Sequence, residues 1–154
     1  MAGPTLRPVT SVNVDAACAL RVSPDQARHV EPVARSLALA YTVPTTAWPR
    51  LVYVGEEPVA FVMAFHDVRW PGDPSGTTRS GVWRLNVDVA HQGKGYGRFA
   101  VEGVCADLAA RGEHVCFVTW HPSAGGPGAF YSRLGFRPTG ELSGDQVVAR
   151  RGLT

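Results

Sequence analysis

The sequence predicts one α/β domain, residues 1–154, built on a mixed β-sheet. Its 154 residues, 45% of them hydrophobic, suit a single domain with one substantial core. Residues 83–120 read as strand, glycine loop, helix and strand, an order that makes the two strands parallel. Residues 50–66 contain two apolar runs joined by a short turn, as in an antiparallel hairpin. We therefore expect an antiparallel N-terminal half and a parallel pair around the glycine loop.

The N-terminal segment predicts a short strand and a short helix. The strand candidate is Leu6–Val12, and Pro8 favours an edge position because proline cannot donate a ladder hydrogen bond. Asn13 or Asp15 can cap the helix, which we expect to end near Leu20.

A second helix is expected from Ser23 to about Tyr41. Ser23 is a typical N-cap and Pro24 suits the first helical position. Pro44 forces the chain out of the helix soon after Tyr41. The apolar stripe of this helix comprises Val30, Val33, Ala34, Leu37 and Ala38.

Two strands are expected next, Arg50–Val54 and Pro58–His66, joined by a three-residue loop at Gly55–Glu57. The second strand is almost entirely apolar, so both of its faces should be covered. A loop rich in Gly, Pro, Asp and Ser then runs from Arg69 to Ser80 without periodicity, and we expect it on the substrate side.

The centre of the chain joins a strand to a helix through a glycine-rich loop. Trp83–Val89 alternates apolar and polar residues, and Phe99–Arg111 has helical spacing. Between them lie Gly93, Gly95 and Gly97, which let backbone amides approach a ligand closely. The free amides and positive dipole at the helix N-terminus favour a phosphate there. The alternative is a tight turn without a ligand.

The spacing of this loop excludes two nucleotide-binding classes, although Lys94 and Arg98 add positive charge to it. No Ser or Thr follows Lys94, as a P-loop requires. Gly97 comes one residue too early for the dinucleotide fingerprint. Glu113, at the distance of a ribose-binding acid, precedes the next strand instead of ending it.

The C-terminal part predicts a buried strand at Val115–Trp120, a short helix at Ala129–Leu134 that ends at Gly135, and a closing strand at Gln146–Ala149. The odd number of cysteines, three, and their spacing predict free thiols and no metal site. The net charge of +2 does not favour nucleic acid, and no stretch is long enough to span a membrane. Cytoplasm is therefore the default location.

Two motifs resemble the GNAT acetyltransferase family. Gln92-Gly93-Lys94-Gly95-Tyr96-Gly97 matches the family pattern Gln/Arg-x-x-Gly-x-Gly/Ala, and Phe130–Phe136 is similar to its Leu-Tyr-x-x-Leu-Gly-Phe segment. Weaker likeness in Phe61–Met63, Trp83–Arg84 and Phe136–Glu141 resembles the bacterial spermidine and diamine N-acetyltransferase branch. The whole similarity covers roughly residues 5–150.

This resemblance implies a GNAT-like acyl-CoA N-acyltransferase fold and acetyl-CoA as co-substrate. In the family the glycine loop wraps the coenzyme pyrophosphate, and the pantetheine arm pairs with the backbone of the central strand. By position the pantetheine-binding residues are Leu85, Asn86 and Val87. The pyrophosphate-binding residues are Gln92, Gly93, Lys94, Gly95, Tyr96, Gly97 and Arg98.

The resemblance also implies catalytic roles. Tyr131 occupies the family's general-acid position, and a phenol with a pKa of about 10 stays protonated at neutral pH. The alternative is a core tyrosine. Thr119 stands where some members carry a basic Glu, so His121 becomes the candidate base, although it could be only a loop residue. Ala124 replaces an Asn that contacts pantetheine in many members.

The expected acceptor is a small-molecule primary amine, with a polyamine such as spermidine suggested by the branch. Glu31 and Asp67, with Asp73, are the candidate acids for holding its ammonium groups, and solvated surface charge is the alternative for each. Other interpretations are an acetyltransferase for a protein N-terminus or an antibiotic amine, and an acyl-CoA-binding sensor without turnover. A homodimer is compatible with the sequence, whereas nucleic-acid and membrane partners are not expected.

Overall fold

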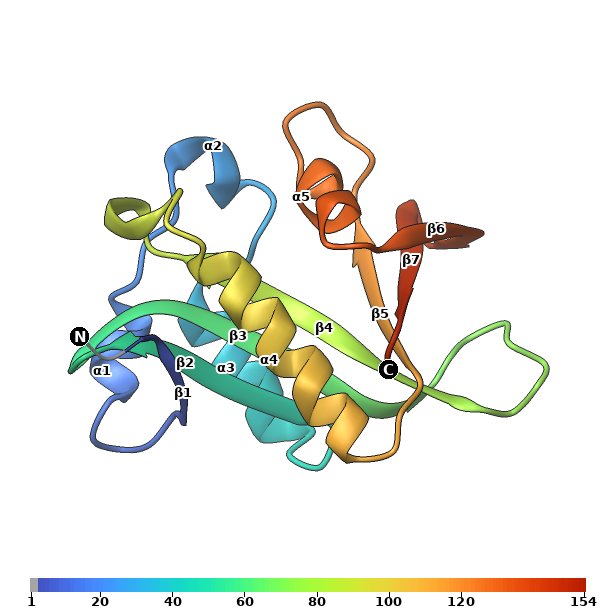
Figure 1. Cartoon of the computed structure of the whole chain (residues 1–154), viewed down its shortest axis with the longest axis horizontal. Helices are drawn as coiled ribbons and strands as arrows, with labels where there is room; N and C mark the ends of the chain where they lie inside the picture. Colours follow the sequence, from blue (N-terminus) through green and yellow to red (C-terminus); the bar gives the residue numbers. More distant parts are fainter. Residues whose placement is uncertain (1–2) are drawn as a thin grey trace.

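The computed structural model describes residues 3–154 and confirms the predicted mixed α/β fold (Figure 1). The sheet has seven strands in the order β1-β2-β3-β4-β5-β7-β6, and β4–β5 is its parallel pair. The strands are β1 Thr5–Pro8, β2 Ala47–Val54, β3 Glu57–Arg69, β4 Thr78–Val87, β5 Val115–Trp120, β6 Arg137–Ser143 and β7 Gln146–Gly152. The helices are α1 Val14–Cys18, α2 Pro24–Ala27, α3 Val33–Thr42, the 3-10 helix η1 Val89–His91, α4 Tyr96–Ala110 and α5 Gly128–Arg133.

Helices cover both faces of the sheet. On one face α4 packs against a cluster that includes Val62 and Ala64 of β3. On the other face α1 and α3 pack against Phe61 and Met63 of the same strand. The four side chains are fully buried, which confirms that the apolar run of β3 is covered on both faces.

The helix expected from Ser23 to Tyr41 is wrong, because the chain forms two helices there. Helix α2 ends at Ala27, and α3 begins at Val33 directly after Pro32. A proline disfavours helical dihedrals in the residue before it, so the segment ahead of Pro32 becomes a loop. The side chain of Ser23 also makes no capping hydrogen bond.

Several strand boundaries differ from the sequence prediction. Strand β1 ends at Pro8, because the Asn13 side chain donates to the Pro8 carbonyl oxygen and accepts from the Thr10 amide, which closes a turn. Glu57 belongs to β3, so the β2–β3 loop has two residues rather than three. Strands β3 and β4 also extend into the expected 69–80 loop. Strand β6 was not predicted, since its Pro and Gly residues disguise the strand pattern.

Strands β4 and β5 touch at one place and then separate (Figure 1). Their register contains the single pair Gly81↔Phe117. A Cβ atom at Gly81 would lie 1.9 Å from the Phe117 carbonyl oxygen, so only glycine permits this approach. Ala64 pairs with Val82 and Met63 pairs with Arg84, which leaves Trp83 as a bulge residue in β4. Beyond Gly81, a wedge therefore opens between the carboxyl ends of β4 and β5.

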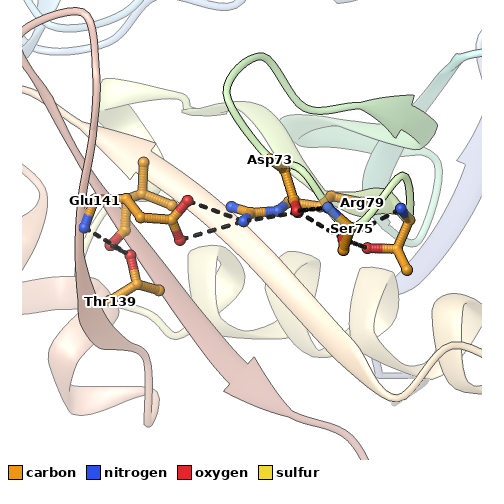
Figure 2. A network of polar contacts seen from close by, with 7 residues as sticks. Asp73, Ser75, Arg79, Thr139 and Glu141 are labelled. Carbon is orange, nitrogen blue, oxygen red and sulfur yellow. Dashed lines mark hydrogen bonds and ion pairs between the residues drawn. The ribbon is translucent and has the colours of Figure 1, made fainter.

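Figure 2 shows a polar network at the closed end of this wedge. Arg79 of β4 donates to Glu141 of β6 at 2.9 Å and to Asp73 of the β3–β4 loop at 3.2 Å. Its guanidinium also lies 4.5 Å from the centre of the Phe117 ring of β5. Only 10% of the Arg79 side chain is exposed. Arg79 thus joins the β3–β4 loop, β5 and the β6–β7 hairpin on one side of the sheet.

Candidate active site

A cavity of about 790 Å³ occupies the wedge between β4 and β5. One wall is the β4 segment Trp83–Val87, and the other is the end of β5 from Thr119 onward. The glycine loop and the start of α4 form one end, and the α2–α3 loop closes the opposite face. Helix α5 completes the lining with Phe130 and Tyr131.

The glycine loop presents free backbone amides to this cavity. Gly93 and Gly95 have left-handed φ angles of +76° and +87°, and nothing lies within 4 Å of a Cβ built on either. Among residues 3–154, no hydrogen-bond acceptor pairs with the amides from Gly93 to Arg98. These amides meet the N-terminus of α4, a 15-residue helix. The loop can therefore hold an anionic group such as a pyrophosphate.

Side chains on both sides hold the loop in place. The Gln92 amide nitrogen donates to the Val87 carbonyl oxygen at 3.1 Å and to the Gln26 side chain of α2 at 2.7 Å. Gly97 is buried, and a Cβ there would lie 3.3 Å from the Phe130 ring. Of the seven loop residues that the sequence points to, all line the cavity except Lys94, which is exposed beside it.

The β4 wall is divided between the two faces of the sheet. Leu85 and Val87 lie on the α4 face and line the cavity. Asn86 points to the other face, is 4% exposed, and donates to the Glu31 carbonyl oxygen at 2.9 Å. Since β5 diverges after Gly81, the β4 backbone groups directed toward β5 have no partner strand along this wall. An extended chain could pair there.

Tyr131 lies inside the cavity wall and is 6% exposed. Its ring stacks on Trp120 at 5.8 Å with an interplanar angle of 6°, and it contacts Phe130 and Phe136 edge-on. Burial, with a smaller contribution from Cys116, raises the pKa of Tyr131 well above its ordinary value. The phenol is therefore protonated at every pH at which the protein would work, as a proton donor must be.

His121 follows β5 at the cavity rim, with half of its side chain exposed. Its Nδ1 lies 3.4 Å from an Asp145 carboxylate oxygen, and its Nε2 lies 3.2 Å from the Gln146 amide nitrogen. Thr119 lines the β5 wall, and Ala124 is exposed in the following loop. The structure thus brings His121 and Tyr131 to one cavity from opposite ends of the loop that joins β5 to α5.

Only one of the two predicted acceptor-binding acids lines the cavity. Glu31 lines the cavity from the α2–α3 loop. Asp67 does not, because it lies near the end of β3, where Val68 pairs with Arg79 at the closed end of the wedge. Asp73 belongs to the Arg79 network at that end as well. The Arg69–Ser80 loop is therefore wrongly placed by the sequence prediction on the substrate side.

Sequence reasoning missed Arg84, which lines the cavity beside the bulge residue Trp83. Its Nη1 donates to the Trp83 carbonyl oxygen at 3.2 Å, and its buried Nε has no partner among the described residues. Burial lowers the pKa of Arg84, while Glu31 acts in the opposite direction. The strand alternation placed Arg84 on a polar outer face. Arg84 is half-buried because the α2–α3 loop lies over that face, and no local sequence pattern indicates this.

Within residues 3–154, no group of three or more His, Cys, Asp or Glu side chains is arranged to hold a metal ion. None of the helices described has the length and hydropathy to cross a membrane.

The chain matches the family model described as "Acetyltransferase (GNAT) family" over residues 17–136. It therefore belongs to the GNAT family and is an acetyl-CoA-dependent N-acetyltransferase. A search of curated proteins finds no sequence match for the chain.

Solved structures share its fold at low sequence identity. The GNAT domain of PAT from S. lividans superposes with a TM-score of 0.74 at 17% identity, covering 96% of this chain and 89% of that one. The ribosomal-protein-S18-alanine N-acetyltransferase of Escherichia coli gives 0.70 at 15% identity, with 99% and 95% covered. The PaiA N-acetyltransferase of Thermoplasma acidophilum, solved with coenzyme A, gives 0.68 at 10% identity, with 98% and 99% covered.

Proposed function

We propose that the β4–β5 wedge is the active site and that an acetyl group passes directly from acetyl-CoA to a primary amine within a ternary complex. The observation that carries this proposal is one continuous cavity. It joins the free amides of the glycine loop, the edge of β4 that has no partner strand and the Tyr131 side chain. Acetyl-CoA supplies the acetyl group as a reactive thioester.

At the coenzyme end, the amides from Gly93 to Arg98 bind the pyrophosphate, and the Arg98 side chain adds positive charge. The backbone groups of Leu85 and Val87 that face the wedge pair with the pantetheine arm in place of a neighbouring strand. Asn86 offers no free group to the arm, because its backbone pairs with Phe61 of β3 and its side chain is bound to the Glu31 carbonyl oxygen, so its predicted role as a binding residue is reduced to supporting its neighbours. The Val87 amide is the candidate donor to the thioester oxygen as negative charge develops there.

At the reacting end, Tyr131 donates its proton to the departing thiolate. Burial keeps the phenol protonated, and the stacked Trp120 ring holds its orientation. His121 accepts a proton from the incoming ammonium, directly or through water, since an amine must be neutral to attack. The half-exposed position of His121 at the rim gives that proton a path to solvent.

The acceptor end faces the α2–α3 loop. A polyamine such as spermidine is the acceptor that the weaker sequence resemblance suggests, and Glu31 is the single predicted carboxylate that lines the cavity. A protein N-terminus or an antibiotic amine would use the same transfer chemistry.

The coenzyme assignment is tested by a Gly95→Val substitution. A side chain at Gly95 would project into the open space above the loop and block pyrophosphate approach, so calorimetry should show coenzyme A affinity reduced at least 10-fold. Gly76→Val is the matched control, because Gly76 also has a left-handed φ, +74°, and an open environment, but lies outside the cavity lining. Equal coenzyme affinity in the two folded variants would contradict the assignment. Thiol release with a panel of amines then identifies the acceptor.

A further inference from the structure

We propose that the acceptor amine carries a carboxylate, as an amino acid does, and that Arg84 binds this carboxylate. The proposal rests on the proposed function, because it names the substrate class of the same cavity. It differs from the polyamine interpretation, in which carboxylates of the protein would hold a cationic substrate.

The position of Arg84 supports this role. Arg84 pairs with Met63 on the face covered by α1 and α3, opposite the face that carries Leu85 and Val87. It therefore lies on the acceptor side of the β4 wall, next to the strand segment proposed to hold the pantetheine arm. A carboxylate on Arg84 would keep an amine on the adjacent carbon close to that wall.

Arg84 also lacks a carboxylate partner, although its Nη1 donates to the Trp83 carbonyl oxygen. No carboxylate in residues 3–154 lies within 4.0 Å of its guanidinium, and its Nε is buried without an acceptor. By contrast, Arg79 binds two carboxylates, and Arg151 binds Glu102. A half-buried guanidinium costs free energy unless an acceptor compensates for the lost water. A bidentate carboxylate from the substrate supplies that acceptor.

The charge of the cavity points the same way. Its lining contains four arginines, Arg28, Arg84, Arg98 and Arg133, and one carboxylate, that of Glu31. Arg98 lies at the coenzyme end and Arg133 on α5, whereas Arg28 and Arg84 lie on the acceptor side with Glu31. This balance attracts an acid and repels a polycation. Glu31 can then hold the ammonium before it loses its proton.

The test compares lysine, lysinamide and cadaverine, which share an amine-bearing chain and differ at the carboxylate. Thiol release should give a kcat/KM for lysine about 10- to 100-fold above the other two, the range for a charged hydrogen-bonded pair. Arg84→Gln should remove this preference. Arg35→Gln is the control, because it deletes a charge near Arg84 on a side chain outside the cavity lining. A structural role for Arg84 is tested by Tm, which should not fall in Arg84→Gln, since no protein ion pair is lost.

Preference for cadaverine or spermidine over lysine would overturn the carboxylate proposal and leave the acetyltransfer proposal intact. Equal rates for lysine and lysinamide would overturn it too, and would favour a peptide N-terminus. Calorimetric binding of Nα-acetyl-lysine, which is acetylated on the amine next to the carboxylate, to the coenzyme A complex gives a readout that needs no turnover. Binding lost in Arg84→Gln but kept in Arg35→Gln would support the carboxylate site even if no amine were acetylated. Absence of both lysine turnover and Arg84-dependent binding would overturn the carboxylate proposal, and thiol release with the wider amine panel would then decide the acetyl-transfer proposal separately.

Discussion

The contact between β4 and β5 at Gly81 makes the sharpest prediction of this structure. In Gly81→Ala the new Cβ would lie 1.9 Å from the Phe117 carbonyl oxygen and 2.6 Å from its carbonyl carbon, whereas ordinary contact begins at 3.4 Å. The obstructing atoms are backbone and cannot rotate away. Overpacking in a core costs about 1–3 kcal/mol when side chains can adjust, so we expect a loss of at least about 3 kcal/mol here.

Urea unfolding measures this loss, with Gly152→Ala as the control. Gly152 lies on β7 without a left-handed φ, and nothing lies within 4 Å of a Cβ at that position. The control should change the free energy of unfolding by no more than about 0.5 kcal/mol. A Gly81→Ala protein as stable as the control would refute the argument that the strands meet at Gly81, and with it the origin proposed for the wedge.

Three further substitutions test other parts of the molecule. Tyr131→Phe retains the ring and removes the proposed proton donor, so kcat should fall about 100-fold while coenzyme affinity in calorimetry stays constant. Arg79→Met keeps an unbranched chain but removes the ion pairs to Glu141 and the β3–β4 loop, so Tm should fall by about 2–8 °C. In His66→Gln the free energy of unfolding should depend less on pH below about 6.5 than it does in the wild-type protein. Burial lowers the pKa of His66, Arg111 adds to this, and Asp107, 3.3 Å away, opposes it. In the unfolded chain His66 therefore binds a proton as the pH falls below about 6.5, whereas in the folded protein it stays neutral until a lower pH. The free energy of unfolding of the wild-type protein consequently decreases as the pH falls below that value.

Each of these substitutions has its own contradicting outcome. A Tyr131→Phe enzyme with the wild-type rate would make Tyr131 a packing residue and leave proton donation to water. Arg69→Met is the control for Arg79→Met, since Arg69 is exposed on a neighbouring strand, and equal Tm values would deny the network a stabilising role. For His66, urea unfolding at several pH values is the measurement, and parallel curves for the two proteins would show that His66 does not titrate differently on folding.

Local patterns predicted much of the fold because their physical causes are local. The boundaries of β5, Val115–Trp120, agree with the sequence prediction residue for residue. The double burial of β3 followed from its unbroken apolar run, and the parallel pair followed from the strand, helix and strand order. The predicted helix from Ser23 to Tyr41 is wrong because Pro32 interrupts it, although the apolar spacing continues on both sides of the proline.

The same division holds for the candidate site. The glycine loop and Tyr131 could be predicted from short motifs, since consecutive residues build an amide-lined turn and a short helix wherever the chain carries them. Asp67 and Arg84 could not, because their relation to the cavity depends on strand register and on which end of the sheet opens. The sequence shows that Asp67 is acidic and Arg84 is basic, but it does not show how far apart β4 and β5 lie.

By itself, the sequence determined the mixed sheet, the strand, glycine loop, helix and strand order at its centre, and the free backbone of the glycine loop, all of which follow from periodicity, helix ends and backbone freedom. Only the tertiary structure decided that β4 and β5 separate after Gly81, that Trp83 forms a bulge, and that the face carrying Arg84 is covered by the α2–α3 loop. Those features arise from contacts between residues far apart in the chain. The shape of the cavity and the charges that line it therefore became visible only once the sheet was assembled.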